Sequence, residues 1–296
     1  MNLFKRFAKI KPKQKYSNFK KLFYVVLMNI VIMQFKDKVV WITGASSGIG
    51  RAVSMALSEQ RANIIISSRN IEKLEEVKLQ CKEPVKIKIL KVDLDDYLNL
   101  NKLVQKAISL FGNIDILINN GGISQRSLAI DTDITIDTRI FKTNYFGTVA
   151  LTKALLPYFV ARKTGQIVVV TSVVGKIGTP LRSSYAASKH ALHGFFDSLR
   201  SEVYDDNITV TLICPGYVNT NVSINALTAD GSPQNRLDKA TANGLSPEYL
   251  AKRMLQAIAK KKQEVVIGGK LERLAVYMKR FFPRVLARMT RKIPVT

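Results

Sequence analysis

The chain has 296 residues, 47% of them hydrophobic and 23% charged, so it can bury a substantial core and is not a disordered polymer. Its 16 Gly, 9 Pro and 2 Cys exclude a collagen-like repeat, a disulfide-dense secreted scaffold and a four-thiolate zinc site, and they suit a reducing compartment. The unusual property is charge, because 46 basic against 22 acidic side chains give a net charge of +24.

This excess charge is concentrated at the two ends. Residues 1–32 hold eight basic and no acidic side chains, residues 33–248 hold 25 and 20, and residues 249–296 hold 13 and 2. Basic ends suit an anionic partner, either membrane lipid or nucleic acid, although a solvated surface has the same composition.

An apolar segment, residues 22–33, follows the basic leader. It is shorter than the roughly 20 residues that span a bilayer, and no small-residue cleavage site follows it. Two interpretations stay open. Residues 1–32 are a marginal anchor facing the cytoplasm, or an extension upstream of a misassigned start, with the protein beginning at Met33.

From Lys38 onward, short β-branched runs alternate with amphipathic helical patterns. Strands that read as continuous Val/Ile runs are buried on both faces, so helices must cover both sides of a parallel sheet. This predicts one doubly wound α/β domain with its ligand at the carboxyl ends of the strands. The predicted strands are 39–43, 62–67, 85–92, 114–119, 166–171, 207–213 and 264–267, and the predicted helices are 49–60, 71–81, 97–111, 138–161, 183–204 and 247–261.

The first predicted strand runs into a glycine-rich turn and then a helix. Glycines let the backbone approach a pyrophosphate, whose charge meets the free N–H groups of the helix N-terminus. The spacing is G-x-x-x-G-x-G, and alone it is also consistent with a simple tight turn. The candidate phosphate-binding residues are Gly44, Ser46, Ser47, Gly48, Ile49 and Gly50.

The end of the second strand indicates which dinucleotide binds. No carboxylate stands there to accept hydrogen bonds from a ribose 2′-OH, whereas Ser68 and Arg69 suit a 2′-phosphate, which favours NADP(H). Alternatively, Arg69 is a solvated residue near a helix start. Asp93 and Leu94 follow the third strand and could hold the adenine edge, although Asp93 could equally be a helix N-cap.

Tyr185 and Lys189 are four residues apart, hence on one face of a predicted helix. A cation roughly 5 Å away, at an effective dielectric of about 20, favours phenolate by about 3 kcal/mol, or about two pKa units. We therefore expect Lys189 to lower the pKa of Tyr185 to about 8, where the phenol can exchange a proton with a substrate oxygen. A surface pair would have the same spacing.

Ser172 follows the strand before that helix, where its hydroxyl could hold the substrate oxygen. Asn144, in the preceding predicted helix, could retain a water that links Lys189 to solvent, or simply be a packing residue. We expect no metal site, and we interpret His190 and His193 as packing or surface residues because the sequence places no other ligands beside them.

These motifs together resemble the short-chain dehydrogenase/reductase family over about residues 36–268. The T-G-x-x-x-G-I-G loop is present at 43–50, the N-N-A-G segment reads Asn119-Asn120-Gly121-Gly122, and a Pro-Gly pair follows the sixth strand. The segments 119–127 and 215–227 are similar to the dehydrogenase/reductase member-7 group, related to 11-beta-hydroxysteroid dehydrogenases. Gly121 departs from the family's usual Ala, which we regard as a minor change.

The resemblance implies a Rossmann-type fold with a seven-stranded sheet and hydride transfer between a nicotinamide and a carbonyl or alcohol carbon. It implies an NADP(H)-dependent oxidoreductase acting on the CH-OH group of donors, a carbonyl reductase for lipophilic substrates, and a homodimer or homotetramer. It assigns catalysis to Asn144, Ser172, Tyr185 and Lys189, and further cofactor contacts to Asn120, Gly121, Tyr185, Lys189, Pro215, Gly216, Val218 and Thr220.

Two segments flank the predicted active site. Residues 217–245 are too long for a plain connection and are interpreted as a lid over the substrate. Residues 269–296 form a basic amphipathic tail that Pro283 should kink. Such a tail could lie on anionic lipid, or dock on its own domain or another subunit. The predicted units are thus the extension 1–32, the catalytic domain 33–268 and the tail 269–296.

Our leading hypothesis is an NADP(H)-dependent carbonyl reductase in the cytoplasm or on the cytoplasmic face of a membrane. No nucleic-acid partner is expected. The competing hypothesis is a non-catalytic nucleotide-sensing or nucleic-acid-binding protein that keeps the fold and uses the basic ends, in which case binding would depend steeply on salt.

Overall fold

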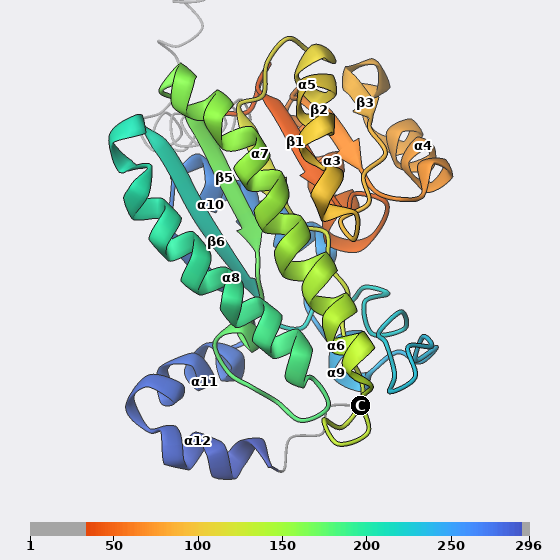
Figure 1. The fold of residues 1–296 in the computed structure, drawn as a ribbon, viewed down its shortest axis with the longest axis vertical. Helices are drawn as coiled ribbons and strands as arrows, with labels where there is room; N and C mark the ends of the chain where they lie inside the picture. Colours follow the sequence, from red (N-terminus) through yellow and green to blue (C-terminus); the bar gives the residue numbers. More distant parts are fainter. Residues whose placement is uncertain (1–33, 292–296) are drawn as a thin grey trace, which may run out of the picture.

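Continuous runs of Val and Ile form a sheet that is buried on both faces, as the sequence predicts. A computed structural model describes residues 34–291, in which seven parallel strands lie in the order β3-β2-β1-β4-β5-β6-β7 (Figure 1). The order reverses direction between β1 and β4, which is where ligands bind in doubly wound folds. The strands are β1 (Val39–Thr43), β2 (Asn63–Ser67), β3 (Ile87–Ile89), β4 (Ile116–Asn119), β5 (Gly165–Val170), β6 (Ile208–Pro215) and β7 (Glu264–Ile267).

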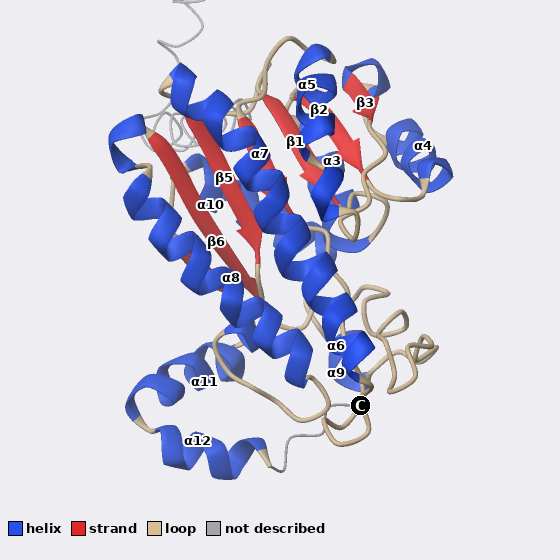
Figure 2. Ribbon diagram, in the orientation of Figure 1, coloured by secondary structure: helices blue, strands red, loops and turns tan. Residues whose placement is uncertain are grey.

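Helices cover both faces of this sheet, so the predicted α/β architecture is confirmed. One core lies between the sheet and three helices, α3 (Gly48–Glu59), α4 (Ile71–Gln80) and α10 (Pro247–Ala259). The second core lies on the opposite face, where α7 and α8 cross in front of the strands (Figure 2). The helices of that layer are α5 (Asn101–Ser109), α7 (Gly147–Arg162) and α8 (Ser183–Glu202).

Two predicted helices differ from the structure. The pattern over 138–161 is not one helix, because α6 (Ile134–Phe141) and α7 are joined by a π-helical turn, Lys142–Phe146. The pattern over 97–111 is likewise split into a 3₁₀ turn, Tyr97–Asn99, and α5. A π turn adds one residue and shifts the helical phase at a single point, which a search for one continuous helical repeat does not locate.

The segment 217–245 and the tail form the end of the molecule that lies past the carboxyl ends of the strands (Figure 1). The segment 217–245 contains one short helix, α9 (Lys239–Ala242), and joins the body where Leu227 N donates to Ser124 O at 2.9 Å. The tail forms α11 (Lys270–Phe281) and α12 (Pro283–Thr290), so the predicted break at Pro283 is confirmed.

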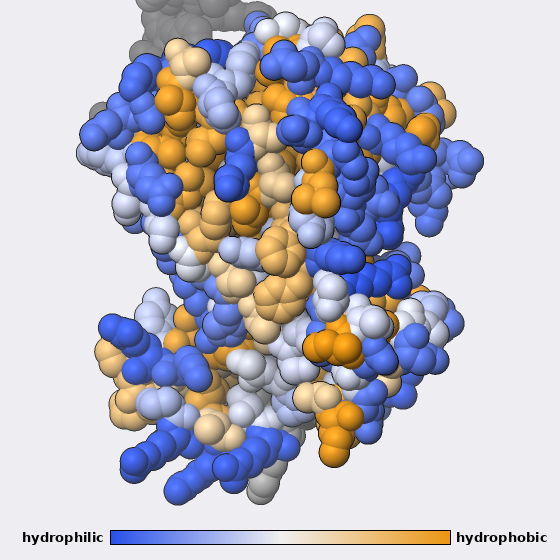
Figure 3. All heavy atoms as spheres, viewed as in Figure 1, coloured by the Kyte–Doolittle hydropathy of each residue, from blue (hydrophilic) through white to orange (hydrophobic). Residues whose placement is uncertain are grey.

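The tail docks on its own domain through one face and leaves its other face exposed. Leu286 of α12 is buried and packs with Val173 and Ile177, which follow β5. Basic and apolar side chains lie next to one another over these helices, at the lower left of Figure 3. The exposed large apolar residues of the tail are Leu271, Leu274, Tyr277, Phe281, Phe282, Val285 and Met289.

No helix within residues 34–291 is both long enough and apolar enough to cross a bilayer. The apolar segment 22–33 and the alternative start at Met33 lie outside these described residues.

Candidate active site

The glycine-rich turn between β1 and α3 is packed against the loop after β4. A Cβ at Gly44 would lie 2.7 Å from the Cα of Gly121, and one at Gly50 would lie 2.3 Å from the carbonyl oxygen of Gly44. Gly44 and Gly48 also adopt φ values of 64° and 51°, which disfavour other residues. Asn120 holds the turn from the other side, where its Nδ2 donates to the oxygens of Thr43 and Gly44 at 3.1 Å.

This turn lines a cavity of about 560 Å³ at the switch point of the sheet. Ser47, the N-cap of α3, makes no side-chain hydrogen bond to the helix, so the first-turn N–H groups are left for a ligand. A cradle of glycine backbone at a helix N-terminus fits a dinucleotide pyrophosphate. The predicted cofactor residues that line this cavity are Gly44, Ser46, Ser47, Gly48, Ile49, Ser68, Arg69, Asp93, Leu94, Asn120, Gly121 and Thr220, whereas Gly50 is packed behind the turn.

One end of this cavity is basic. Ser68 and Arg69 follow β2, and the exposed Arg69 lies beside Lys73, which also lines the cavity but was not predicted. Asn70 caps α4 by accepting a hydrogen bond from Lys73 N at 2.8 Å, which positions the first turn of that helix. Lys73 could have been found from its position one turn after the cap.

Leu94 and Gly121 form another part of the lining of this cavity. Leu94 is buried, and a Cβ on Gly121 would lie 2.6 Å from its Cδ1. The family's Ala at this position would therefore require the Leu94 side chain to shift, so Gly121 and Leu94 are matched to each other. Asp93 accepts a hydrogen bond from Asp95 N at 3.0 Å, which also stabilises the local turn.

A second cavity of about 580 Å³ continues from the first, and both are bounded by Ile49, Asn120, Gly122 and Thr220. Ser172 reaches it from the loop after β5, and Tyr185 and Lys189 reach it from the first two turns of α8. The structure thus brings together three side chains that are up to 17 positions apart in the sequence. The predicted residues Pro215, Gly216 and Val218 also line this cavity.

Hydrogen bonds orient the polar side chains of this cavity. Lys189 Nζ donates to Val170 O at 2.9 Å and lies 5.9 Å from the centroid of the Tyr185 ring. Ser172 Oγ accepts a hydrogen bond from Val174 N at 3.1 Å, while its contact with Pro215 O is long, at 3.4 Å. The hydroxyl is therefore held in place but can still donate to a ligand oxygen.

Asn144 lies behind the cavity, in the π-helical turn. Its side chain bonds both backbone groups of Ile123, accepting from N at 2.8 Å and donating to O at 2.9 Å, and it also donates to Ser188 Oγ. A Cβ on Gly122 would lie 3.0 Å from Asn144 Oδ1 and 3.5 Å from Lys189 Nζ, so the amide and the ammonium flank the same backbone. The π turn therefore brings Asn144 into the site.

The expected pKa of Tyr185 is corrected by the structure. Burial of the phenol raises its pKa, and the opposing influences are a hydrogen bond with Ser172 and the charges of Arg182 and Arg126. Lys189 is itself buried, which lowers its pKa to about 8, so it is still mostly charged at neutral pH but loses its charge in mild base. The predicted lowering by Lys189 alone is therefore wrong, because the sequence could not show that Lys189 is buried and Tyr185 half-buried.

The two arginines belong to a buried ion cluster that sequence reasoning missed. Arg126 Nε and Nη2 donate to Asp238 Oδ2 at 2.9 and 2.6 Å, and Arg182 Nη2 lies 3.6 Å from the same oxygen. Asp238 is fully buried, and Arg126 and Arg182 both line the cavity that contains Tyr185. Two cations share one carboxylate here, and the charges of both guanidinium groups oppose the rise in the pKa of the phenol.

Gln125 connects this cluster to the start of α8. Its Oε1 accepts hydrogen bonds from Ser184 N at 2.9 Å and from Tyr185 N at 3.4 Å. The side chain is fully buried, and its Nε2 donates to Ser127 Oγ at 3.1 Å. The helix that presents Tyr185 is therefore anchored at its first turn by the loop after β4.

The tail forms part of the cavity wall. Glu272 of α11 accepts hydrogen bonds from Gly269 N and, at 2.9 Å, from Tyr217 N at the base of the predicted lid. Leu271 and Ala275 of the same helix also line the cavity. Docking of the tail on its own domain was one of the two predicted alternatives, but amphipathic periodicity could not identify the surface that α11 contacts.

Comparisons with known proteins identify the family of the chain. Residues 38–230 match the family model described as short chain dehydrogenase. The chain is 42% identical over 264 residues to the dehydrogenase/reductase SDR family member 7B of Bos taurus, covering 86% of this chain and 80% of that protein. It is 45% identical over 257 residues to the dehydrogenase/reductase SDR family protein 7-like of Anopheles gambiae, covering 84% of this chain and 80% of that protein.

Solved structures support the fold. A short-chain dehydrogenase/reductase from Burkholderia phymatum in complex with NAD has a TM-score of 0.76 at 20% identity, with 89% of this chain and 99% of that chain covered. ElxO with NADP bound has a TM-score of 0.66 at 24% identity, with 78% of this chain and 97% of that chain covered. With a matching family model, relatives above 40% identity and a seven-stranded Rossmann-type sheet, this chain belongs to the short-chain dehydrogenase family of oxidoreductases.

Proposed function

We propose that the protein is an NADP(H)-dependent carbonyl reductase, reversible as an alcohol dehydrogenase acting on the CH-OH group of donors. The observation that carries the proposal is the continuity of the two cavities. Ser172, Tyr185 and Lys189 line one of them, and the glycine-rich turn lines the other, so a dinucleotide in the cradle would end beside the phenol.

The chain's own residues would handle the proton. Ser172 Oγ, held by Val174 N, would donate a hydrogen bond to the substrate oxygen. Tyr185 would give its proton to that oxygen during reduction and take it back during oxidation. Lys189 and the Arg126–Arg182 pair would stabilise the phenolate that remains, and Asn144 would hold the backbone beside Lys189. The nicotinamide, when bound, supplies or accepts the hydride.

The preference for NADP(H) rests on the basic end of the nucleotide cavity. Ser68, Arg69 and Lys73 line it, and no carboxylate follows β2 that could accept hydrogen bonds from a ribose 2′-OH. A guanidinium and an ammonium at this place favour a 2′-phosphate through charge-assisted hydrogen bonds.

A lipophilic substrate is supported by the walls of the second cavity. Val174 and Ile177 form one side, and Leu271 and Ala275 of α11 face them. We propose that the segment 217–245 acts as the lid, since it contributes Tyr217, Val218, Thr220, Val222 and Thr241 to the wall. The Arg126–Asp238 contact ties this segment to the body.

NADPH consumption against a panel of steroid, retinoid, fatty and small aromatic carbonyls tests the proposal. We expect turnover with at least one lipophilic carbonyl and weaker turnover with NADH. The non-catalytic alternative predicts no NADPH oxidation across the panel and salt-dependent binding to duplex or single-stranded nucleic acid. A filled cluster of Ser, Tyr and Lys beside a nucleotide cradle supports the enzyme over that alternative.

We also propose that the tail meets an anionic membrane surface. Exposed Leu271, Phe281 and Phe282 lie among basic residues, and α11 lines the substrate cavity, so lipid contact would place the cavity near a source of lipophilic substrate. Sedimentation of the full chain with phosphatidylserine vesicles tests this. The double variant Phe281→Ser, Phe282→Ser should weaken binding, whereas Leu79→Ser, which alters an exposed leucine on α4, should not. Equal binding by both variants would contradict a role for the tail.

A further inference from the structure

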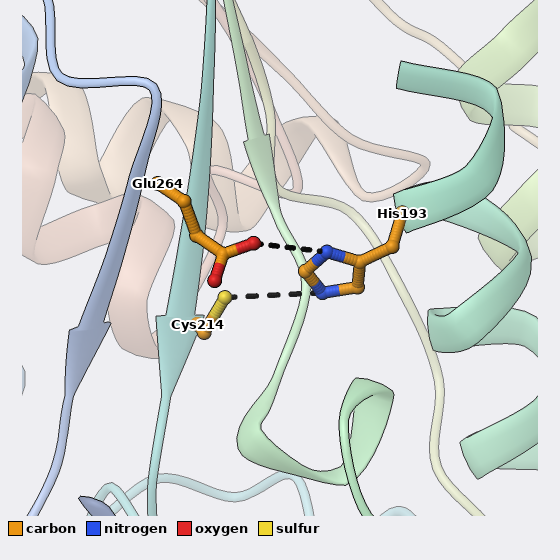
Figure 4. Close-up of side chains that lie close together, drawn as sticks. All are labelled: His193, Cys214 and Glu264. Atoms are coloured by element: carbon orange, nitrogen blue, oxygen red, sulfur yellow. Dashed lines mark hydrogen bonds and ion pairs between the residues drawn. The ribbon is translucent and has the colours of Figure 1, made fainter. Parts of the chain in front are cut away.

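A buried cluster of three side chains lies behind the wall that carries Lys189 and Ser172. His193 stands one helical turn after Lys189 on α8, Cys214 is near the end of β6, and Glu264 begins β7. Figure 4 shows Cys214 and Glu264 approaching opposite nitrogens of the His193 ring. Within residues 34–291, this is the one group of three or more His, Cys, Asp or Glu side chains close enough to share an ion, with all ligand atoms within 4.8 Å of one another.

The sheet register explains why distant residues meet here. Glu264 is paired with Leu212, and Cys214 follows Leu212 by two positions on β6. Side chains two positions apart on a strand share a face, and so do partners in a parallel pair, so Cys214 and Glu264 both point toward the layer that contains α8. His193 reaches them from that helix.

The distances suit coordination of a small cation. Cys214 Sγ lies 3.8 Å from His193 Nε2, close to the roughly 3.6 Å between sulfur and nitrogen ligands that share a tetrahedral zinc ion. Glu264 Oε2 lies 3.4 Å from His193 Nδ1. The Glu264 side chain is partly exposed, so it can rotate toward the nitrogen that faces the thiol.

The cluster is not satisfied by hydrogen bonds alone. His193 is 7% exposed, and its Nδ1 has no hydrogen bond of acceptable geometry, although the Glu264 carboxylate is near enough for an ion pair. Only long contacts therefore hold the ring, and they leave Nε2, the nitrogen that faces Cys214, available to an ion. The Cys214 thiol accepts only a weak hydrogen bond from Thr171 Oγ1, at 3.3 Å.

The same three residue types could form a nucleophile, base and orienting carboxylate, but their burial argues against that reading. Cys214 is fully buried and lines neither of the two cavities described above, so no external substrate could reach its sulfur. A metal ion is much smaller than a substrate molecule, and it could enter beside the exposed part of the Glu264 side chain.

We propose that His193, Cys214 and Glu264 form a site for one divalent transition-metal ion of the zinc type. Thiolate and imidazole ligands favour such ions over magnesium or calcium. The sulfur–metal bond forms as the thiol proton leaves to solvent, no electron is transferred, and water would take the fourth position. Lys176 Nζ, now 2.6 Å from Glu264 Oε2, would give up that carboxylate to the ion.

Cobalt(II) is a suitable probe because thiolate and tetrahedral coordination give it distinct absorption bands. The full chain, stripped with a chelator, should bind one equivalent of Co²⁺ with a thiolate-to-metal charge-transfer band in the near ultraviolet, and Zn²⁺ should displace it. The chain provides matched controls, since it has two cysteines and two histidines in all. Cys214→Ser and His193→Gln should lose the charge-transfer and tetrahedral bands, respectively, while Cys81→Ser and His190→Gln should retain both.

A variant that binds Co²⁺ more tightly cannot be explained by unfolding, so it complements the variants that are expected to lose binding. Lys176→Met removes the cation that competes for Glu264, and we expect about fivefold tighter Co²⁺ binding, the equivalent of a weak ion pair. Glu264→Gln, at a partly exposed position, should weaken binding. The proposal is overturned if the wild-type chain gives no charge-transfer band, if the band persists in Cys214→Ser, or if Lys176→Met leaves the affinity unchanged.

Discussion

The nucleotide side and the substrate side of the site are built in different ways. The nucleotide side consists of strand-to-helix turns, in which a few consecutive residues such as 43–50 set their own geometry. The substrate side depends on contacts between distant parts of the chain, with Arg126 and Asp238 separated by 112 positions and Tyr217 and Glu272 by 55. Cofactor binding can therefore be inferred from short motifs, whereas substrate binding depends on how the lid and tail pack.

The largest expected effect falls where the two sides meet. Tyr185→Phe should lower kcat for carbonyl reduction by about 10³-fold, because general acid catalysis contributes roughly that much. NADPH affinity, measured by fluorescence titration, should change little. Tyr204→Phe, an exposed tyrosine in the turn after α8, is the matched control and should keep full activity. Comparable turnover by Tyr185→Phe would remove the phenol from the proposed chemistry.

The next largest effect tests the long-range contacts of the substrate side. Asp238→Asn leaves two buried guanidinium groups without their shared carboxylate, which should cost about 3–5 kcal/mol of unfolding free energy. Urea denaturation measures this loss, and Asp205→Asn, at an exposed position, should lose far less. If the two variants unfold at the same urea concentration, the cluster does not hold the lid to the body.

A smaller effect tests the nucleotide side. Arg69→Asp should weaken NADPH binding by about 1.5–3 kcal/mol, the usual value of a charge-assisted hydrogen bond, and should favour NADH relative to NADPH. The ratio of kcat/KM for the two cofactors is the measurement, and it serves as its own control for folding. An unchanged ratio would show that Arg69 is a solvated surface residue.

The smallest expected effect is a dependence of the reduction rate on pH, caused by the titration of Lys189. Burial lowers the pKa of Lys189 to about 8, so the ammonium is charged below this pH and neutral above it. Stabilisation of the phenolate should weaken as the pH rises, and the rate of carbonyl reduction should be about tenfold lower one pH unit above this pKa. The kcat/KM profile between pH 6 and 10 tests this.

Lys189→Arg provides the control for that profile, because arginine keeps its charge throughout the range. The decline of kcat/KM in this variant should move to higher pH. A decline at the same pH in the variant and in the wild-type protein would exclude Lys189 as its origin.

The stability of the fold should change with pH in the opposite direction to the rate. Because the folded-state pKa of Lys189 is below its ordinary value of 10.5, the cost of burying the charge is relieved as the pH rises from about 8 to 10.5.

The contrast between the nucleotide side and the substrate side also explains which features could be predicted from the sequence. The order of strands and helices followed from apolar periodicity. In the nucleotide cavity, the glycine-rich turn and the Ser68–Arg69 pair followed from local motifs, whereas Lys73 was missed. The π turn at Asn144 was missed because one inserted residue shifts the helical phase at a single point within a long apolar pattern. The arginine cluster was missed because nothing near Arg126 in the sequence points to Asp238.

Burial accounts for the remaining differences. The pKa of Tyr185 could not be predicted from a spacing of four residues, since desolvation of the phenol outweighs the groups that lower it. His193 was interpreted without ligands because Cys214 lies 21 positions away and Glu264 on a different strand. Properties that arise from depth and from pairing between strands become visible only when the chain is folded.

The most direct test of the proposed chemistry follows the hydride itself. NADPH carrying deuterium at the transferred position of the nicotinamide would be incubated with the protein and a carbonyl substrate from the panel. We expect an alcohol product one mass unit heavier, with the deuterium on the former carbonyl carbon. An alcohol product without deuterium, or no product from any carbonyl of the panel, would contradict hydride transfer at this site.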